Sequence, residues 1–329
     1  MTRAIDVNAL TRHFGNLVAV DAVDFWVNKG EVFGFLGPNG AGKTTTISML
    51  TTLLKPSAGT ATVAGHDIRS EQSAVRSSIG IVFQEPSLDD RLTARENLNF
   101  HGVLYNVPPQ IRRERIDELL KLVDLDSRAD DIVEKFSGGM KRRLEIARGL
   151  LHTPEILFLD EPTIGLDPQT RRNMWDHIKR LREETGTTIF MTTHYMDEAE
   201  FCNRIAIMDH AGIVALDTPE GLKRMVGGDV ITVRTPDSND LVDFLSTEPV
   251  MTTQRNGSIR IEVQEGAPFI PHLAREFKGR IDAIELRRPT LDDVFLKLTG
   301  RTIRESELDQ VDLNRNRLRM MVRRRRGHG

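Results

Sequence analysis

A glycine-rich octapeptide near the start of the chain has the composition of a phosphate-binding loop. It reads Gly37-Pro38-Asn39-Gly40-Ala41-Gly42-Lys43-Thr44 and lies between an expected buried strand at residues 31–36 and an expected helix at residues 44–54. The glycines let backbone amides turn onto phosphate oxygens, and the helix N-terminus adds its dipole. Lys43 supplies a charge for the β and γ phosphates, and Thr44 offers a hydroxyl to Mg²⁺. The pattern predicts a nucleoside triphosphate site; a glycine-rich turn without a ligand is the alternative.

An acidic pair, Asp160-Glu161, follows the apolar run at residues 156–159. A buried strand that ends in two carboxylates delivers Asp160 to a metal ion and leaves Glu161 able to polarise a water molecule. Two buried acids are costly unless a cation or a proton compensates them. The spacing alone also allows surface-exposed helix caps, but the phosphate-binding loop in the same chain favours a magnesium site.

The composition indicates an ordinary globular protein with room for two domains. The chain has 329 residues, 39% of them hydrophobic and 28% charged, with 45 Lys plus Arg against 48 Asp plus Glu, a net charge of −3. This balance excludes a disordered polyelectrolyte and a globally basic nucleic-acid binder.

The single cysteine, Cys202, excludes an intramolecular disulfide framework and fits a reducing compartment. The N-terminus lacks the apolar core of a secretory signal. No run approaches the roughly 18 apolar residues of a membrane helix, so a membrane process would need another chain.

Residues 4–226 alternate short β-rich runs with helical stretches, which is typical of an α/β domain with mainly parallel strands. Residues 85–152 break this alternation and are nearly all helical. Thr93 and Glu96 form a capping box at a helix start there. We therefore expect a helical subdomain inserted into the sheet domain. Buried strands are expected at residues 31–36, 79–83, 156–159, 187–191 and 204–208.

A second, smaller domain is expected at residues 229–300. Its elements follow the order βαββαβ, which is that of a small ferredoxin-like α+β sheet, with a type I′ hairpin turn at Asn256-Gly257. A last helix, capped by Thr290, is expected from residue 291 to residue 298. Residues 301–329 then hold nine Arg and four acidic residues, a net charge of +5. This basic segment is either a solvated, flexible tail or a region attracted to anionic headgroups or an acidic partner.

The segment Phe136-Ser137-Gly138-Gly139-Met140 resembles the signature motif of ATP-binding-cassette (ABC) ATPases. The order and spacing of several motifs support the resemblance over residues 4–226. These motifs are the loop from Gly37 to Thr45, Gln84 after a strand, Ser137 to Met140, Asp160-Glu161, Gly165-Leu166-Asp167 and His194. The resemblance implies a P-loop NTPase fold that binds ATP and Mg²⁺. Phe136, Met140 and Ile164 depart from the usual family residues, and Ile164 leaves the geometry of the dimer seam less certain.

The resemblance also implies roles for individual residues. Glu161, His194, Gln84 and Lys43 would be catalytic, and Thr44, Gln84 and Asp160 would hold Mg²⁺. ATP would be bound by Phe14, Gly37, Pro38, Asn39, Gly40, Ala41, Gly42, Lys43, Thr44, Thr45, Ser137, Gly138, Gly139 and Asp167. Phe14 would stack on adenine, unless it is an ordinary core residue, and His194 would hydrogen-bond the γ-phosphate. Ser137 and Gly139 would reach the nucleotide of a second copy, and Asp167 would lie at the seam of a homodimer that encloses two ATP molecules.

The C-terminal region resembles the daunorubicin-resistance type of ABC exporter ATPase. The resemblance rests on Asp217-Thr218-Pro219-Glu220 and on the α/β extension that ends in Leu291-Asp292-Asp293-Val294-Phe295-Leu296-Lys297-Leu298. It implies a peripheral protein at the cytoplasmic face of the cell membrane that powers export of a drug, antibiotic or other hydrophobic compound through a separate integral membrane permease. Leu291, Val294, Phe295 and Leu298 pack either against the ATPase domain or its twin, or inside the small domain itself.

Two other functions remain to be weighed. A soluble ABC ATPase that acts on ribosomes or nucleic acid would usually carry two cassettes or a long coiled-coil insertion, for which the stretch between Lys43 and Asp160 leaves no room. A P-loop kinase is disfavoured by the signature motif and by His194. We therefore expect no nucleic-acid partner, and we expect a permease helix to dock on the surface between Gln84 and Arg95.

Overall fold

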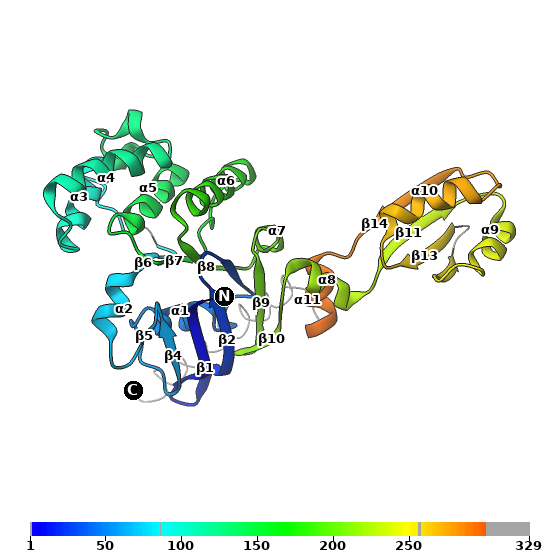
Figure 1. The fold of residues 1–329 in the computed structure, drawn as a ribbon, viewed down its shortest axis with the longest axis horizontal. Helices are drawn as coiled ribbons and strands as arrows, with labels where there is room; N and C mark the ends of the chain where they lie inside the picture. The colour runs from blue at the N-terminus through cyan, green and yellow to red at the C-terminus, as the bar shows by residue number, and fades with distance from the viewer. Residues whose placement is uncertain (1, 86, 256–257, 301–329) are drawn as a thin grey trace, which may run out of the picture. The chain divides into compact units, whose positions relative to one another are not determined.

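The computed structural model describes residues 2–85, 87–255 and 258–300 (Figure 1). Packing divides the chain into two compact units, the first of which ends at Leu216 while the second begins at Asp217. The sequence placed this division later, between residues 226 and 229. The turn predicted at Asn256-Gly257 and the basic segment at residues 301–329 lie outside the described residues.

Six strands form the central sheet of the first unit, in the order β10-β9-β3-β8-β7-β6. Neighbouring strands from β9 to β6 run parallel, and every residue of β3, β7 and β8 is buried. Strands covered on both faces are continuous apolar runs, and all five predicted buried strands are confirmed. Their carboxyl ends lie at one edge of the sheet. The strands are β3 (Val32–Leu36), β6 (Ile79–Val82), β7 (Ile156–Asp160), β8 (Thr188–Thr193), β9 (Arg204–Asp209) and β10 (Gly212–Asp217).

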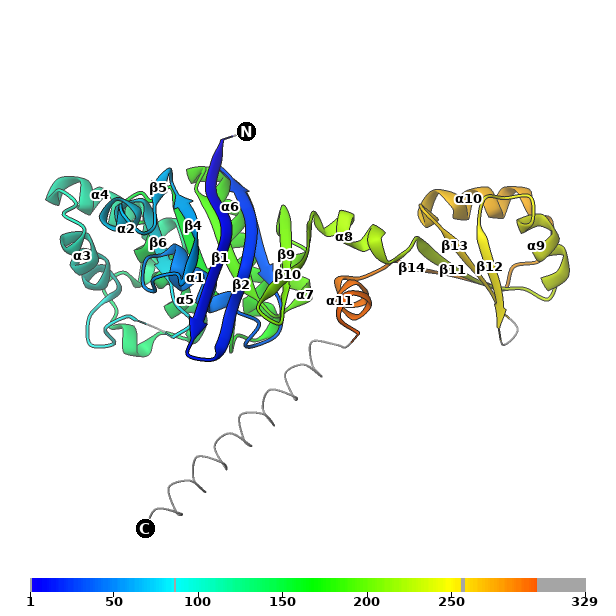
Figure 2. The ribbon, with the colours of Figure 1, turned by 90° about the horizontal axis from the view of Figure 1, so that it is seen from below.

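An antiparallel sheet with the order β2-β1-β4-β5 belongs to the same unit, and its long strands β1 and β2 run side by side in Figure 2. A cluster of aromatic rings connects the two sheets: Phe25 of β2 lies 5.6 Å from Phe33, 5.0 Å from Phe35 and 6.1 Å from Phe190, measured between ring centroids. Rings packed in this way bury a large apolar area. The strands are β1 (Arg3–Phe14), β2 (Leu17–Asn28), β4 (Ala58–Val63) and β5 (His66–Asp67).

The helix after the phosphate-binding loop, α1 (Lys43–Leu50), is shorter than the sequence predicted. It buries Ile47, Met49 and Leu50 in the core between the sheets. The predicted end at residue 54 is wrong, because Thr52 adopts a φ of 62°, a left-handed conformation that a right-handed helix cannot include.

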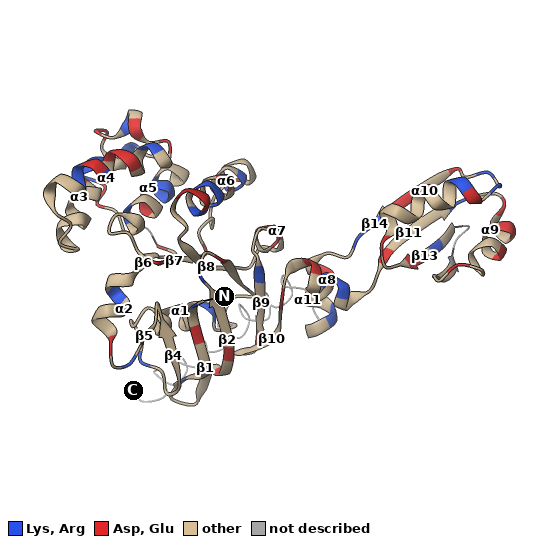
Figure 3. Ribbon diagram, in the orientation of Figure 1, with Lys and Arg blue, Asp and Glu red and all other residues tan. Residues whose placement is uncertain are grey.

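The predicted helical subdomain is present between β6 and β7. The capping box is confirmed, since Thr93 Oγ1 accepts a hydrogen bond from Glu96 N at 3.1 Å and Glu96 Oε2 accepts one from Thr93 N at 2.8 Å. Charged residues are frequent on α4 and α6 and sparse on the central strands (Figure 3). The helices of the first unit, besides α1, are α2 (Gln72–Ser78), α3 (Ala94–Leu104), α4 (Pro109–Leu122), α5 (Gly138–Leu150), α6 (Pro168–Thr185) and α7 (Met196–Ala199), with short 3-10 turns at Asp126–Arg128 and Val133–Lys135.

The second unit contains a four-stranded sheet in the order β12-β13-β11-β14, with every neighbouring pair antiparallel. This order and the sequence βαββαβ confirm the ferredoxin-like α+β prediction. Its core is formed by apolar side chains such as Ile231, Ile261 and Leu273. The elements are β11 (Asp229–Arg234), α9 (Ser238–Leu245), β12 (Met251–Arg255), β13 (Ser258–Val263), α10 (Gly266–Glu276) and β14 (Ala283–Arg287).

Two further helices of the second unit, α8 (Pro219–Val226) and α11 (Leu291–Thr299), pack against each other. Lys297 Nζ on α11 donates hydrogen bonds to the carbonyl oxygens of Met225 and Val226, at 2.8 and 3.0 Å. Phe295 is fully buried and lies outside the core cluster of the ferredoxin-like sheet. The apolar stripe of α11 therefore packs on α8. Within the described ranges, no helix combines the length and apolar character needed to cross a bilayer.

We predict that Phe295→Ala destabilises the α8–α11 pair by about 3 to 5 kcal/mol, because it removes a fully buried aromatic side chain. Leu296→Ala is the matched control on the same helix, since Leu296 is 44% exposed, and we expect a change within about 0.5 kcal/mol. Amide hydrogen exchange at α8 and α11 measures the local opening free energy. Equal effects of the two substitutions would contradict the packing described here.

Candidate active site

The phosphate-binding loop connects β3 to α1 and keeps its backbone close to neighbouring strands. Gly42 adopts a φ of 109°, and a Cβ atom at this position would lie 2.4 Å from the carbonyl oxygen of Ala19. Only glycine fits both the left-handed conformation and this close approach. Lys43 Nζ donates hydrogen bonds to the carbonyl oxygens of Gly37 and Pro38, at 2.7 and 3.1 Å. The loop therefore curves around its own lysine.

Asp160 is the last residue of β7 and is buried. Its Oδ1 atom accepts hydrogen bonds from Thr192 Oγ1 at 2.6 Å and from Thr44 Oγ1 at 3.2 Å. Burial raises the pKa of Asp160 above its ordinary value, although the Thr192 and Thr44 hydroxyls act in the opposite direction. The fold thus brings the predicted magnesium ligands Thr44 and Asp160 into direct contact.

Glu161 lies between Lys43 and His194. Its Oε1 atom is 3.5 Å from Lys43 Nζ, and its Oε2 atom is 3.4 Å from His194 Nδ1. Burial raises the pKa of Glu161, but His194 and Lys43 together outweigh burial, so the net pKa lies below its ordinary value. Glu161 is consequently charged at neutral pH and able to accept a hydrogen bond from water. The predicted catalytic residues Lys43, Glu161 and His194 form one cluster.

ATP and Mg²⁺ fit this cluster. Glu161 Oε2 and His194 Nδ1 are buried and lie 3.4 Å apart, and neither has a hydrogen-bond partner among the described residues, so each can still receive a polar group. The side-chain oxygens of Thr44 and Asp160 are of the type that Mg²⁺ prefers. The amides of the loop and the N-terminus of α1 provide the positive potential that binds phosphate.

Three polar residues of the site were not identified from the sequence. Thr192 donates to Asp160 and also accepts a hydrogen bond from Glu161 N at 3.0 Å. Thr193 Oγ1 donates to Glu198 Oε2 at 2.6 Å, and the buried Glu198 accepts a second hydroxyl from Thr163. Burial raises the pKa of Glu198 above its ordinary value. Two hydroxyl residues at the end of an apolar strand were a usable signal for Thr192 and Thr193, whereas no local pattern indicates the partners of Glu198.

Other predicted residues lie outside the Lys43–Glu161–His194 cluster. Phe14 at the end of β1 is 46% exposed, with the Arg12 guanidinium 4.6 Å from its ring centroid, so it is no core residue. Gln84 is exposed in the bend that follows β6, and no hydrogen bond to Thr44 or Asp160 is found for it among the described residues.

The signature segment forms the start of α5. Ser137 is the N-cap, and its hydroxyl accepts a hydrogen bond from Met140 N at 3.3 Å. A Cβ atom at Gly139 would lie 2.6 Å from Thr170 Cγ2, so glycine permits the close packing of α5 on α6. Asp167 caps α6 by accepting hydrogen bonds from the amides of Gln169 and Thr170.

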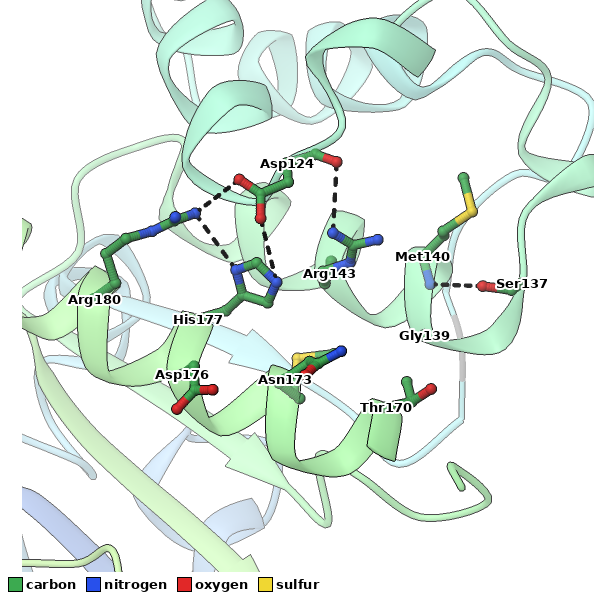
Figure 4. A pocket seen from close by; sticks show the side chains of 11 residues that line it. Asp124, Ser137, Gly139, Met140, Arg143, Thr170, Asn173, Asp176, His177 and Arg180 are labelled. Carbon is green, nitrogen blue, oxygen red and sulfur yellow. Dashed lines mark hydrogen bonds and ion pairs between the residues drawn. The ribbon is translucent and has the colours of Figure 1, made fainter. Parts of the chain in front are cut away.

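Ser137 and Gly139 line a pocket of about 510 Å³ between the start of α5 and α6 (Figure 4). Figure 4 shows the Ser137–Met140 contact at one end of the pocket. At the other end, Asp124 contacts Arg180 Nη2 at 3.1 Å. The lining of this pocket includes none of Lys43, Glu161 and His194.

Two family models match the chain. The ABC transporter family matches residues 20–164, and the C-terminal domain of DrrA1-3-like ATP-binding proteins matches residues 218–299. The first match includes the phosphate-binding loop, the signature segment and the acidic pair. The second covers α8, the ferredoxin-like sheet and α11.

Several known proteins are similar over most of the chain. The daunorubicin resistance ATP-binding protein DrrA2 of Streptomyces coeruleorubidus is 38% identical over 319 residues, which cover 94% of this chain and 98% of that protein. The linearmycin resistance ATP-binding protein LnrL of Bacillus subtilis is 40% identical over 306 residues, which cover 90% and 98% of the two chains.

A solved structure shares the fold of the first unit. It is a dimeric, post-hydrolysis state of an ATP-binding cassette bound to ADP and phosphate. The match has a TM-score of 0.59 and 29% sequence identity, and it covers 65% of this chain and 98% of that chain. The chain therefore belongs to the ABC transporter family, in which it is an ATP-binding and ATP-hydrolysing subunit with a DrrA-type C-terminal domain.

Proposed function

We propose that two copies of this chain bind Mg²⁺ and ATP and, by hydrolysing the ATP, power the export of a drug, antibiotic or other hydrophobic compound through a separate membrane permease. The observation that carries the proposal is the contact of Glu161 with both Lys43 and His194, beside the Thr44–Asp160 pair. The DrrA-type C-terminal domain and the resistance proteins among the relatives support export. The subunit would act at the cytoplasmic face of the membrane as a peripheral component.

The residues of the cluster have distinct tasks in this proposal. The loop amides and Lys43 bind the phosphates, and Thr44 and Asp160 hold Mg²⁺, which neutralises charge on the β and γ phosphates. Glu161 orients the attacking water, and His194 hydrogen-bonds the γ-phosphate. Catalysis then consists mainly of positioning and of stabilising the charge on the transferred phosphoryl group.

The second copy completes the site. Ser137 and the amides of Gly138 and Gly139 lie at the start of α5, where the helix N-terminus favours a phosphate. Ser137 and Gly139 line a pocket whose lining does not include Lys43, and we propose that these groups bind the nucleotide of the opposite subunit. Asp167 would lie at the dimer seam, and the exposed ring of Phe14 would stack on adenine.

The permease would dock on the segment from Gln84 to Arg95 and on the adjoining face of α3. Asn97 of α3 connects the two, because its Oδ1 accepts a hydrogen bond from Asp89 N at 2.9 Å and its Nδ2 donates to the Asp89 carbonyl at 3.0 Å. The same helix exposes Phe100 and Leu104. Exposed apolar side chains next to the Gln84 segment favour a partner helix at this place. The daunorubicin and linearmycin resistance proteins named above favour export over a ribosome- or nucleic-acid-dependent ATPase.

We predict that Glu161→Gln retains ATP binding but lowers ATP turnover by about 10²- to 10⁴-fold, because the variant cannot accept a proton from water. We also expect it to dimerise more readily with ATP, since the closed state persists. Glu155→Gln is the control: Glu155 pairs with Lys29 just before β7 and is half exposed. Phosphate release and light scattering measure the two effects. Undiminished hydrolysis by Glu161→Gln would refute the assignment of this residue.

We predict that the permease, but not RNA or DNA, stimulates ATP hydrolysis in reconstituted vesicles. The double variant Phe100→Ser/Leu104→Ser should lose most of this stimulation and keep its basal rate, because both residues lie on the proposed docking face. Leu53→Ser is the control. Leu53 is 58% exposed, which is close to the 60% of Phe100 and the 61% of Leu104, but it follows α1 and lies outside the proposed docking face. Stimulation by nucleic acid in place of the permease would favour the alternative function.

A further inference from the structure

Arg142, on the inner face of α5, is a buried arginine that donates hydrogen bonds in several directions. It is 7% exposed. Its guanidinium group has five N–H donors and makes five hydrogen bonds, four of them to backbone carbonyl oxygens and one to the carboxylate of Glu145. A guanidinium group holds its donors in a rigid planar fork, so fixed acceptors around it are held in fixed relative positions.

Three of the acceptors lie at the end of β7 and in the loop that follows it. Arg142 Nε donates to the carbonyl oxygen of Pro162 at 2.7 Å, and Nη2 donates to those of Asp160 and Glu161 at 3.0 and 3.3 Å. Glu161 has a φ of 45°, a left-handed conformation that is unfavourable for a residue other than glycine. The surrounding structure must impose this conformation, and Arg142 binds the carbonyl group of the residue that adopts it.

The remaining contacts reach the segment that carries Gln84. Arg142 Nη1 donates to the carbonyl oxygen of Phe83 and to Glu145 Oε2, the latter at 3.0 Å. Glu145 is 1% exposed, and its Oε1 accepts a hydrogen bond from Ser87 N at 2.8 Å. Arg142 and Glu145 therefore hold the residues on both sides of Gln84.

The pair is also constrained by its charges. Both side chains are buried, and Glu145 is the carboxylate that the guanidinium contacts. An ion taken out of water is tolerated only with good pairing and complete hydrogen bonding, and removal of one partner leaves an uncompensated buried charge. A displacement of the Phe83–Ser87 backbone therefore strains contacts that also hold the Glu161 backbone.

We propose that Arg142 and Glu145 are a positioning pair that transmits a displacement of the Gln84 segment to Glu161, so that permease docking adjusts the orientation of the hydrolytic carboxylate. The inference rests on the proposed function for the identity of the partner. Neither residue touches nucleotide in this scheme; both act through the backbone of other segments.

The test compares Arg142→Lys and Glu145→Gln in the full-length chain, with and without the permease in vesicles. Lysine retains the charge but lacks the planar fork, and glutamine retains the shape but lacks the charge. We expect Arg142→Lys to lower kcat for ATP by about tenfold to a hundredfold, because small misplacements of a catalytic group have effects of this size. The KM for ATP should stay within about twofold, since the phosphate-binding loop is untouched. Glu145→Gln should reduce the fold stimulation by the permease more than the basal rate.

Arg115→Lys is the matched control. Arg115 also donates from a guanidinium group to backbone carbonyls, those of Leu150 and Leu151 at the far end of α5, but contacts neither the Gln84 segment nor Glu161. It should leave kcat and the fold stimulation unchanged. Hydrogen exchange at residues 83–87 and 160–163 provides a second measurement, in which Glu145→Gln should speed exchange in both segments together.

Two results would overturn the proposal. One is an equal loss of kcat in Arg142→Lys and Arg115→Lys, which would indicate general destabilisation. The other is faster exchange at residues 83–87 alone, with wild-type permease stimulation in Glu145→Gln. If the permease fails to stimulate ATP hydrolysis by the wild-type chain, the proposed function is wrong. The kcat and KM of Arg142→Lys in the isolated chain would still test whether Arg142 positions Glu161.

Discussion

Buried charge at one edge of a parallel sheet is the constraint on which the rest of this structure depends. Lys43, Asp160 and Glu161 are all buried, and each carries a group whose removal from water costs several kcal/mol. The fold offsets this cost with the contact between Lys43 and Glu161 and with hydroxyl groups that donate to Asp160 from neighbouring segments. These contacts require the carboxyl ends of β3, β7 and β8 to be adjacent, which the parallel arrangement provides.

Around these charges, a layer of polar contacts determines where each side chain points. The Thr192 hydroxyl donates a hydrogen bond to the Asp160 carboxylate and accepts one from the backbone amide of Glu161, so one residue of β8 contacts both acidic residues. Glu198 similarly joins Thr193, next to His194, to Thr163, in the loop after the acidic pair. Preorganised groups of this kind need little rearrangement when charge develops during phosphoryl transfer.

Each of the two units is stabilised by a hydrophobic core of its own. The first unit is held by a large apolar core between two sheets, and its polar edge is where the proposed chemistry occurs. The second unit has its own ferredoxin-like core and a separate α8–α11 pair, in which Lys297 caps the carbonyl groups at the end of α8. A separate core in each unit is consistent with distinct tasks, hydrolysis in the first and a DrrA-type accessory role in the second.

The sequence by itself determined the features that depend on local pattern. The glycine-rich loop, the Thr93 capping box, the Thr290 helix cap and the apolar runs of the buried strands all follow from residues close together in the chain, because phosphate cradles, helix starts and strands have short-range signatures. Only the tertiary structure decided that Thr192 holds both acids, that α11 packs on α8, and that Arg142 joins the Gln84 segment to Glu161. Those contacts connect residues far apart in sequence, and the packing of the sheets and helices sets their distances, which no local pattern encodes.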